Sequence, residues 1–220
     1  MPARSLLLDD IVKQYGDGAP VLDGLTHTFE PGTLTMLSGP NGSGKTTLLR
    51  LLSVLAYPTQ GAVRYGDLDV HAHPYRYLQH VGLVHAEATL PEHLTAVELL
   101  EWVLHSRDQW DDTGPERITA LFDRLALDDR RVNLIRTYSS GMVKKAQIGA
   151  AFIPAPRVLL MDEPLRSLDT ATTDATLGLL HDFVADGGVA VVASHLQSEL
   201  STLADDVIEM REGAPSLDHP

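Results

Sequence analysis

The residues with the clearest chemical potential form a glycine-rich segment, Gly39-Pro40-Asn41-Gly42-Ser43-Gly44-Lys45-Thr46. An apolar run, Leu34 to Leu37, precedes this segment, and a helix is expected to follow it from Thr46 to Leu55. Glycines let successive backbone N–H groups turn toward an anion, and the start of a helix adds partial positive charge. The segment therefore predicts a phosphate-binding loop, with Lys45 on the outer phosphates and the Thr46 hydroxyl on Mg²⁺. The expected contacts are Gly39, Pro40, Asn41, Gly42, Ser43, Gly44, Lys45, Thr46 and Thr47.

Two adjacent carboxylates, Asp162 and Glu163, directly follow the apolar run Val158 to Met161. At the end of a buried strand, Asp162 can hold Mg²⁺ through water, and Glu163 can act as a catalytic group that polarises the attacking water. Together with the phosphate loop and a catalytic Lys45, they predict a nucleoside-triphosphate site. The phosphate loop alone fits kinases, GTPases, recombinases and transporter ATPases, and the two carboxylates narrow this range.

The elements that must position these residues show the alternation of an α/β fold. Short strands are expected at Leu6–Ile11, Leu25–Phe29 and Thr33–Leu37. Val158–Met161 and Val189–Ala193 are continuous apolar runs, typical of a parallel sheet buried on both faces, with a helix at about Thr172–Val184 between them. Helical spacing is expected at Thr95–His105, Pro115–Leu125 and Gly141–Phe152.

This pattern predicts one α/β domain over residues 1–220, with a P-loop NTPase core, a parallel or mixed sheet and an antiparallel β portion at the N-terminus. The expected core comprises residues 1–87 and 154–212. A helical subdomain is expected at 88–153, inserted in that core, and a disordered tail at 213–220.

Composition narrows the class of protein further. Thirty acidic and 17 basic residues give a formal charge of -13, which argues against nucleic acid as a partner. There is no cysteine, so disulfides and thiolate metal sites are excluded. The longest apolar runs are far shorter than the ~20 residues of a membrane-spanning helix, and the N-terminus lacks a secretory pattern. A cytoplasmic location is the resulting expectation.

Further motifs stand in the order found in the ATP-binding cassette (ABC) family, which the chain resembles over nearly its whole length. Tyr138-Ser139-Ser140-Gly141-Met142 resembles the signature motif, and Ser167-Leu168-Asp169 resembles the D-loop. The resemblance implies that Ser139, Ser140 and Gly141 contact the nucleotide of a second subunit. It also implies that His195 is a switch histidine that orients water, and that Tyr15 stacks on adenine.

The chain departs from the family pattern at the glutamine loop. Family spacing places Ala86 at the glutamine position, or Glu87 if the loop is one residue shorter. Alanine cannot ligate a metal, which leaves Glu87 as a candidate further ligand of Mg²⁺. Leu165 and Arg166 stand where small polar residues are common, and Met142 replaces a glutamine.

The resemblance implies an ATPase subunit of an ABC transporter that uses ATP and Mg²⁺. Two copies would close over two nucleotides and drive substrate export through a separate transmembrane permease subunit, at the inner face of the cell membrane. Met142, with Lys144 and Lys145, resembles exporters of the ABC-2 type. The alternatives are a soluble ABC ATPase of the iron-sulfur assembly type and a regulatory subunit with slow or no hydrolysis.

Overall fold

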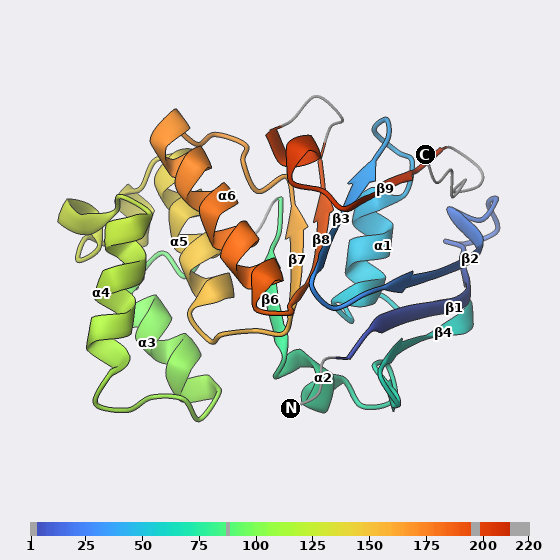
Figure 1. Cartoon of the computed structure of the whole chain (residues 1–220), viewed down its shortest axis with the longest axis horizontal. Coiled ribbons are helices and arrows are strands. Elements are labelled where there is room, and N and C mark those ends of the chain that lie inside the picture. The colour runs from blue at the N-terminus through green and yellow to red at the C-terminus, as the bar shows by residue number, and fades with distance from the viewer. Residues whose placement is uncertain (1–3, 87–88, 195–198, 212–220) are drawn as a thin grey trace.

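The computed structural model describes residues 4–86, 89–194 and 199–211 (Figure 1). A four-stranded antiparallel sheet has the order β2-β1-β4-β5. Its strands are β1 (Leu6–Lys13), β2 (Leu22–Phe29), β4 (Gln60–Tyr65) and β5 (Leu68–Asp69). The antiparallel portion expected near the N-terminus is therefore confirmed.

A second sheet has the order β6-β7-β8-β3-β9, and every neighbouring pair in it is parallel. Its strands are β6 (Val81–Val84), β7 (Val158–Asp162), β8 (Val189–Ala193), β3 (Thr33–Ser38) and β9 (Asp206–Glu209). Every residue of β7 and β8 is buried, as their continuous apolar sequences predict.

Six α-helices accompany the sheets in the described residues: α1 (Lys45–Leu52), α2 (Pro74–Leu78), α3 (Ala96–Ser106), α4 (Gly114–Arg124), α5 (Ser140–Phe152) and α6 (Thr170–Ala185). Short 3-10 turns lie at Asp128–Arg130, Ile135–Thr137 and Glu199–Thr202. None of the helices in this part of the chain is long and apolar enough to span a membrane.

Alternate residues of the parallel strands enter two different cores. Val158 and Leu160 of β7 pack with α1 and the antiparallel sheet, whereas Leu159 and Met161 pack with α5 and α6. Figure 1 shows α1 on one side of the parallel sheet and α5 and α6 on the other. Helices α3, α4 and α5 share a third core. Burial on both faces fixes the position of the strand ends.

The first helix differs from its expected range. It begins at Lys45 and ends at Leu52, not Leu55. Val54 has a φ of 60°, and the N–H groups of Leu55 and Ala56 both donate to the carbonyl of Arg50. This left-handed turn closes the helix before the expected end, because a residue with positive φ cannot continue a right-handed helix.

Phe122 tests the core of α3, α4 and α5, in which it is fully buried. Phe122→Ala is expected to lower the free energy of unfolding by about 3–5 kcal/mol, because it removes buried contacts and leaves a cavity. Tyr75→Ala, at a side chain 74% exposed, is the matched control and should change it by less than about 0.5 kcal/mol. Equal losses in urea titrations of the two variants would contradict the packing described.

Candidate nucleotide-binding site

The phosphate loop connects the end of β3 to the start of α1. Gly44 precedes the helix with a φ of 101°, and Gly39 has a φ of 146°. A Cβ atom on Gly39 would collide with the carbonyl oxygen of Met210, beside β9. Glycine is therefore required at this point by both backbone conformation and the close approach of a neighbouring segment. The loop is held against the sheet with the first turn of α1 behind it.

A cavity of 350 Å³ lies in front of this loop. Its lining contains seven of the nine residues of the predicted contact set, all except Gly39 and Pro40, together with Asp162 at the end of β7 and Glu163 after it. The lining residues are Val21, Asn41, Gly42, Ser43, Gly44, Lys45, Thr46, Thr47, Ala86, Asp162 and Glu163. The fold thus brings together two groups of residues that lie more than a hundred positions apart in the chain.

Lys45 and Ser43 are suited to binding a phosphate group. Lys45 is 9% exposed, and its Nζ donates hydrogen bonds to the carbonyls of Gly39, at 2.6 Å, and Pro40, at 2.9 Å. The buried Oγ of Ser43 has no hydrogen-bond partner among the described residues. Because N–H groups in the first turn of a helix lack intrahelical acceptors, this end of α1 adds donors for an anion. The loop fits the triphosphate of a nucleotide.

Thr46 and Asp162 meet at the junction of α1 and β7. The Thr46 hydroxyl donates to Oδ2 of Asp162 at 3.0 Å, and the aspartate is 5% exposed. A hydroxyl beside a carboxylate is a donor set of hard oxygens, which suits Mg²⁺ and leaves room for water and phosphate oxygens. These two residues could hold the metal as the sequence predicts.

Glu163 follows β7 in an unusual backbone conformation, with a φ of 47°. Its N–H donates to the carbonyl of Ala193 at the end of β8, at 3.0 Å. A non-glycine residue at positive φ carries a conformational cost, and such residues concentrate at functional sites. Here the turn places the half-buried Glu163 in the lining of the cavity.

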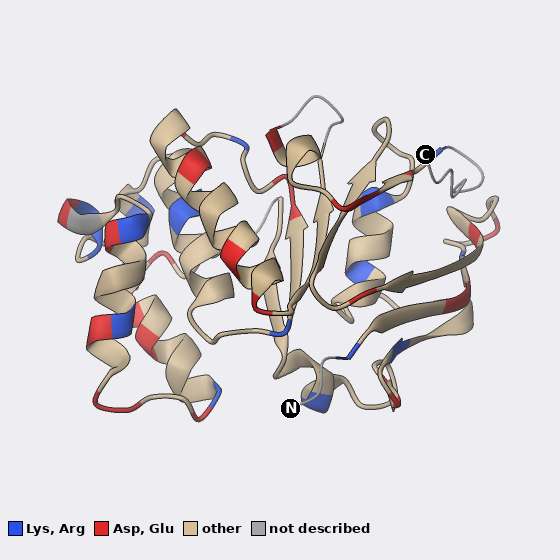
Figure 2. Cartoon of the chain, in the orientation of Figure 1, with Lys and Arg blue, Asp and Glu red and all other residues tan. Residues whose placement is uncertain are grey.

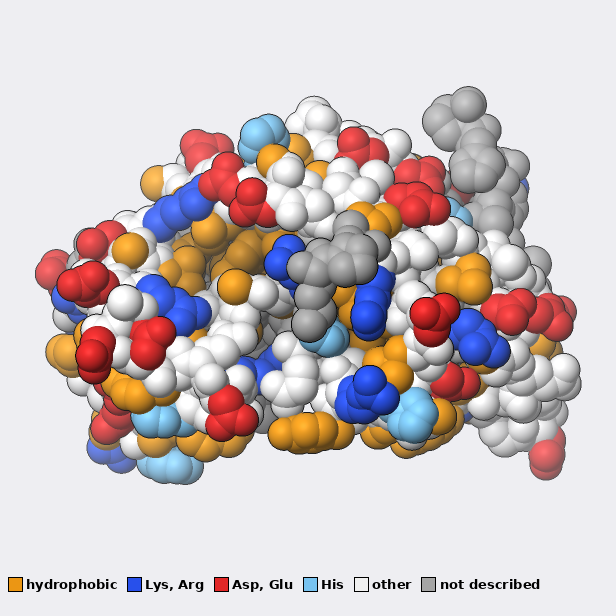
Figure 3. Space-filling model, turned by 60° about the horizontal axis from the view of Figure 1, so that its bottom comes forward, with side chains coloured by type: hydrophobic (Ala, Val, Ile, Leu, Met, Phe, Trp, Pro, Cys, Tyr) orange, Lys and Arg blue, Asp and Glu red, His pale blue; other side chains and the backbone are white. Residues whose placement is uncertain are grey.

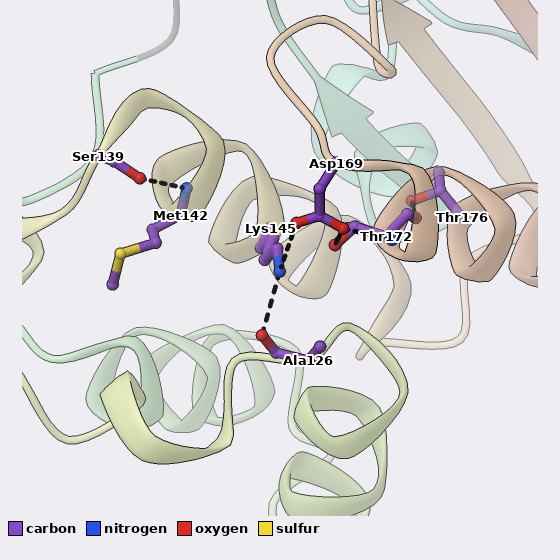
Figure 4. A network of polar contacts seen from close by, with 7 residues as sticks. All are labelled: Ala126, Ser139, Met142, Lys145, Asp169, Thr172 and Thr176. Carbon is purple, nitrogen blue, oxygen red and sulfur yellow. Dashed lines mark hydrogen bonds and ion pairs between the residues drawn. The ribbon is translucent and has the colours of Figure 1, made fainter.

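The signature segment forms the start of α5, outside this cavity. Ser139 precedes the helix, and its Oγ accepts a hydrogen bond from the N–H of Met142 at 3.3 Å (Figure 4). A Cβ on Gly141 would stand 2.7 Å from the carbonyl oxygen of Ser167. Gly141 therefore permits close packing between α5 and the segment that leads to α6, while Ser140 lines a second, adjoining cavity.

Asp169 stands at the start of α6, and its side chain contacts α5. Its Oδ1 accepts hydrogen bonds from the N–H and hydroxyl of Thr172, and its Oδ2 lies 3.4 Å from Nζ of Lys145 (Figure 4). The Lys145 ammonium also donates to the carbonyl of Ala126. The backbone hydrogen bond from Thr172, followed by its hydroxyl and by Lys145, lowers the pKa of Asp169. Asp169 is both the N-cap of α6 and a link to α5.

Three predicted residues remain apart from the cavity or outside the described residues. Tyr15 does not contribute to the lining described above; it is 48% exposed, and Nζ of Lys13 lies 4.6 Å from its ring centroid. Glu87 and His195 lie outside the described residues. Val21 is a lining residue that the motifs did not mark, since an isolated valine near a strand carries no sequence signal.

Charge differs between the two cavities. The described lining of the nucleotide cavity has one lysine and two acids, whereas that of the adjoining cavity has Lys144 and Arg166 and no acid. Figure 2 shows the other acidic residues spread over both ends and the middle of the molecule. An anion in the nucleotide cavity would therefore meet the carboxylates of Asp162 and Glu163 as well as the ammonium of Lys45.

The family model described as "ABC transporter" matches residues 22–166, which span the phosphate loop, the signature segment and both carboxylates. The chain belongs to the ABC transporter family, as an ATP-binding protein. Its α/β fold with a P-loop core is the one that the sequence predicts.

The curated relatives differ in what their names say they do. The daunorubicin/doxorubicin resistance ATP-binding protein DrrA of Streptomyces peucetius is 29% identical over 96% of this chain and 64% of its own length. The Fe(3+) ions import ATP-binding protein FbpC of Brucella abortus is 32% identical over 95% of this chain and 59% of its own length. The chain thus spans less than two thirds of these two relatives.

Solved structures show the same fold. An ATP-binding subunit of an ABC transporter superposes with a TM-score of 0.90 at 24% identity, covering 96% of this chain and 87% of that one. A dimeric bacterial ABC transporter cassette gives a TM-score of 0.87 at 23% identity, covering 96% of each chain.

Asp169 offers a test of the link between α5 and α6. Asp169→Ala should lower the free energy of unfolding by about 1 kcal/mol through loss of the helix cap. Asp169→Asn, the control that keeps a capping oxygen, should lose less. The pKa of Asp169 is lowered in the folded state. The stability that its negative charge contributes is therefore complete above the ordinary Asp pKa, near ~4, and is lost as the pH falls through the pKa of the folded state.

Unfolding curves recorded from pH 7 down to pH 2 measure this effect. The difference between wild type and Asp169→Asn should shrink as the pH falls. A difference that grows in acid would contradict the capping role of the ionised carboxylate.

Proposed function

We propose that this chain is an ATPase subunit that hydrolyses ATP with Mg²⁺ and drives export through a separate transmembrane permease subunit. The observation that carries the proposal is the meeting of Thr46 and Asp162 at 3.0 Å in a cavity whose lining also contains Lys45 and Glu163. Phosphate ligands, a metal position and a candidate base thus share one space.

In the proposed reaction, catalysis depends mostly on positioning and charge. Lys45 and the loop N–H groups hold the β- and γ-phosphates, and Thr46 and Asp162 hold Mg²⁺. Mg²⁺, when bound, neutralises negative charge on the phosphate oxygens. Glu163 orients a water and accepts its proton as the water oxygen bonds to the γ-phosphorus. The bond from that phosphorus to the bridging oxygen breaks, releasing ADP and inorganic phosphate.

Two copies of the ATPase subunit are expected to share the nucleotides. Ser139, Ser140 and Gly141 stand at the start of α5, where a helix dipole and backbone N–H groups favour an anion. This position supports the proposal that they contact the γ-phosphate held by the second subunit, with Asp169 in the connecting segment. Tyr15 on adenine, His195 on water and Glu87 near Mg²⁺ remain predictions from the family resemblance.

The proposal also includes the direction of transport, which is export. The relatives include a drug resistance protein and an iron importer, so similarity alone does not choose a direction. Met142 with Lys144 and Lys145 on the signature helix, which resembles ABC-2 exporters, supports export. The proposed location is peripheral, at the inner face of the cell membrane, where a permease would be contacted.

A regulatory subunit with slow turnover is the second candidate, because Ala86 itself lines the nucleotide cavity. An alanine methyl group offers neither a metal ligand nor a hydrogen bond to water. This alternative expects tight ATP binding with hydrolysis at background level in the complete transporter complex.

Two substitutions separate binding from hydrolysis. Glu163→Gln should keep ATP affinity within about threefold, since the amide fills the same space, but lower hydrolysis by about 10²–10⁴-fold. Lys45→Ala should weaken ATP binding itself, because a charge-assisted contact to phosphate is lost. Nucleotide titrations and steady-state turnover with the co-purified membrane partner measure both effects.

Hydrolysis by Glu163→Gln at the wild-type rate would contradict its role as base. Background turnover in the wild-type complex, with intact ATP binding, would favour the slow regulatory subunit.

A further inference from the structure

A second cavity, of 390 Å³, adjoins the nucleotide cavity and shares the lining residue Ala86 with it. It is formed between α5 and the segment that follows Glu163. Its lining residues are Ala86, Ser140, Val143, Lys144, Gln147, Arg166 and Ser167. Hydroxyl, amide and cationic groups therefore line the second cavity, next to the position at which the γ-phosphate of ATP would be hydrolysed.

Among the described residues, the charged groups of this second lining are both cations. Lys144 is 7% exposed, so its long side chain is packed on α5, whereas Arg166 is exposed on the facing segment. Neither residue forms an ion pair within the described part of the chain. The Lys144 Nζ donates only a long hydrogen bond, of 3.4 Å, to the carbonyl of His85. Two cations that form no ion pair among the described residues favour the binding of an anion in this cavity.

The electrostatics of Lys144 relate the two cavities. Burial lowers the pKa of its ammonium, and Arg166 acts in the same direction, while Asp162 and Glu163 oppose them. Lys144 is thus close enough to sense the carboxylates of the nucleotide site as well as Arg166. Negative charge beside Glu163 and positive charge beyond Ala86 create a potential that would draw a phosphate dianion out of the first cavity and into the second.

The small side chain of Ala86 leaves space for a phosphate to pass from the nucleotide cavity to the second cavity. Its side chain is a single methyl group, it is exposed, and it contributes to both linings. A longer side chain at this point would extend into one cavity or the other. The small residue that departs from the family pattern therefore stands between a site of cleavage and a site of positive charge.

We propose that the second cavity is an oxyanion site that receives the inorganic phosphate cut from ATP in the neighbouring cavity, with Lys144 and Arg166 as its cationic ligands. The product role rests on the proposed ATPase function, whereas the capacity to bind phosphate does not. The ligand comes from the same chain's own nucleotide cavity, which distinguishes this site from the start of α5 that is proposed to face a second subunit.

The binding test uses inorganic phosphate, titrated calorimetrically into full-length protein saturated with ADP and Mg²⁺. Arg166→Ser and Lys144→Met should each weaken phosphate binding about tenfold, the loss expected for one charge-assisted contact. Arg64→Ser is the matched control, because it removes an exposed arginine on β4, outside both linings, and should leave phosphate affinity unchanged. ADP affinity should be equal in all four proteins.

The outcomes are distinguishable. Undetectable phosphate binding by the wild type, or equal affinity in all four proteins, would overturn the site. If Lys144→Met does not fold, Arg166→Ser decides the question, since Arg166 is exposed. If the wild type fails to bind ADP, the proposed function is wrong, and the same phosphate titration without nucleotide still tests the cavity.

A kinetic arm separates product phosphate from free phosphate. In wild-type turnover, release detected by a phosphate sensor should trail cleavage measured by rapid quenching, and Arg166→Ser should shorten that interval. Release that coincides with cleavage in the wild type would mean that the site accepts free phosphate only, which would overturn the product role.

Discussion

The hydrogen bond from Thr46 to Asp162 joins two segments that are 116 positions apart, and the rest of the site depends on it. It forms because β3 and β7 run parallel on either side of β8, so that their carboxyl ends lie at one edge of the sheet. One strand leads into the phosphate loop and the other ends in Asp162. The two-sided burial of β7 and β8 keeps this edge in place, because a slip of one residue would move every side chain into the opposite core, whose packing it does not fit.

Much of this arrangement could be predicted from local sequence. The phosphate loop combines glycines, one lysine and flanking elements in a pattern that few other structures use, and the apolar runs at β7 and β8 predict burial on both faces. The start of α4 at Gly114, with Pro115 in its first turn, also follows a local rule. The strands β4, β5 and β9 were not predicted, since their sequences are short and lack a continuous apolar run.

Contacts between distant residues could not be predicted in this way. Arg166 and Lys144 are 22 positions apart, and only the packing of α5 against the segment before α6 brings them to one cavity. Gly141 permits that approach, because any Cβ there would meet the carbonyl of Ser167. Figure 3 shows a hollow lined largely by hydrophobic side chains, with acidic groups at its rim and over the rest of the face. Among the described residues, the second cavity is lined by two cations and no acid, whereas the nucleotide cavity contains Asp162 and Glu163.

The magnesium dependence of ATP binding tests the central contact most directly. Calorimetric titrations of wild type and Thr46→Val with ATP, each with Mg²⁺ and with EDTA, would compare a hydroxyl with a group of the same shape that cannot ligate a metal. We expect Mg²⁺ to tighten ATP binding by at least about tenfold in the wild type, and most of this gain to be lost in Thr46→Val. An equal gain in both proteins would contradict the assignment of Thr46 and Asp162 as the metal position.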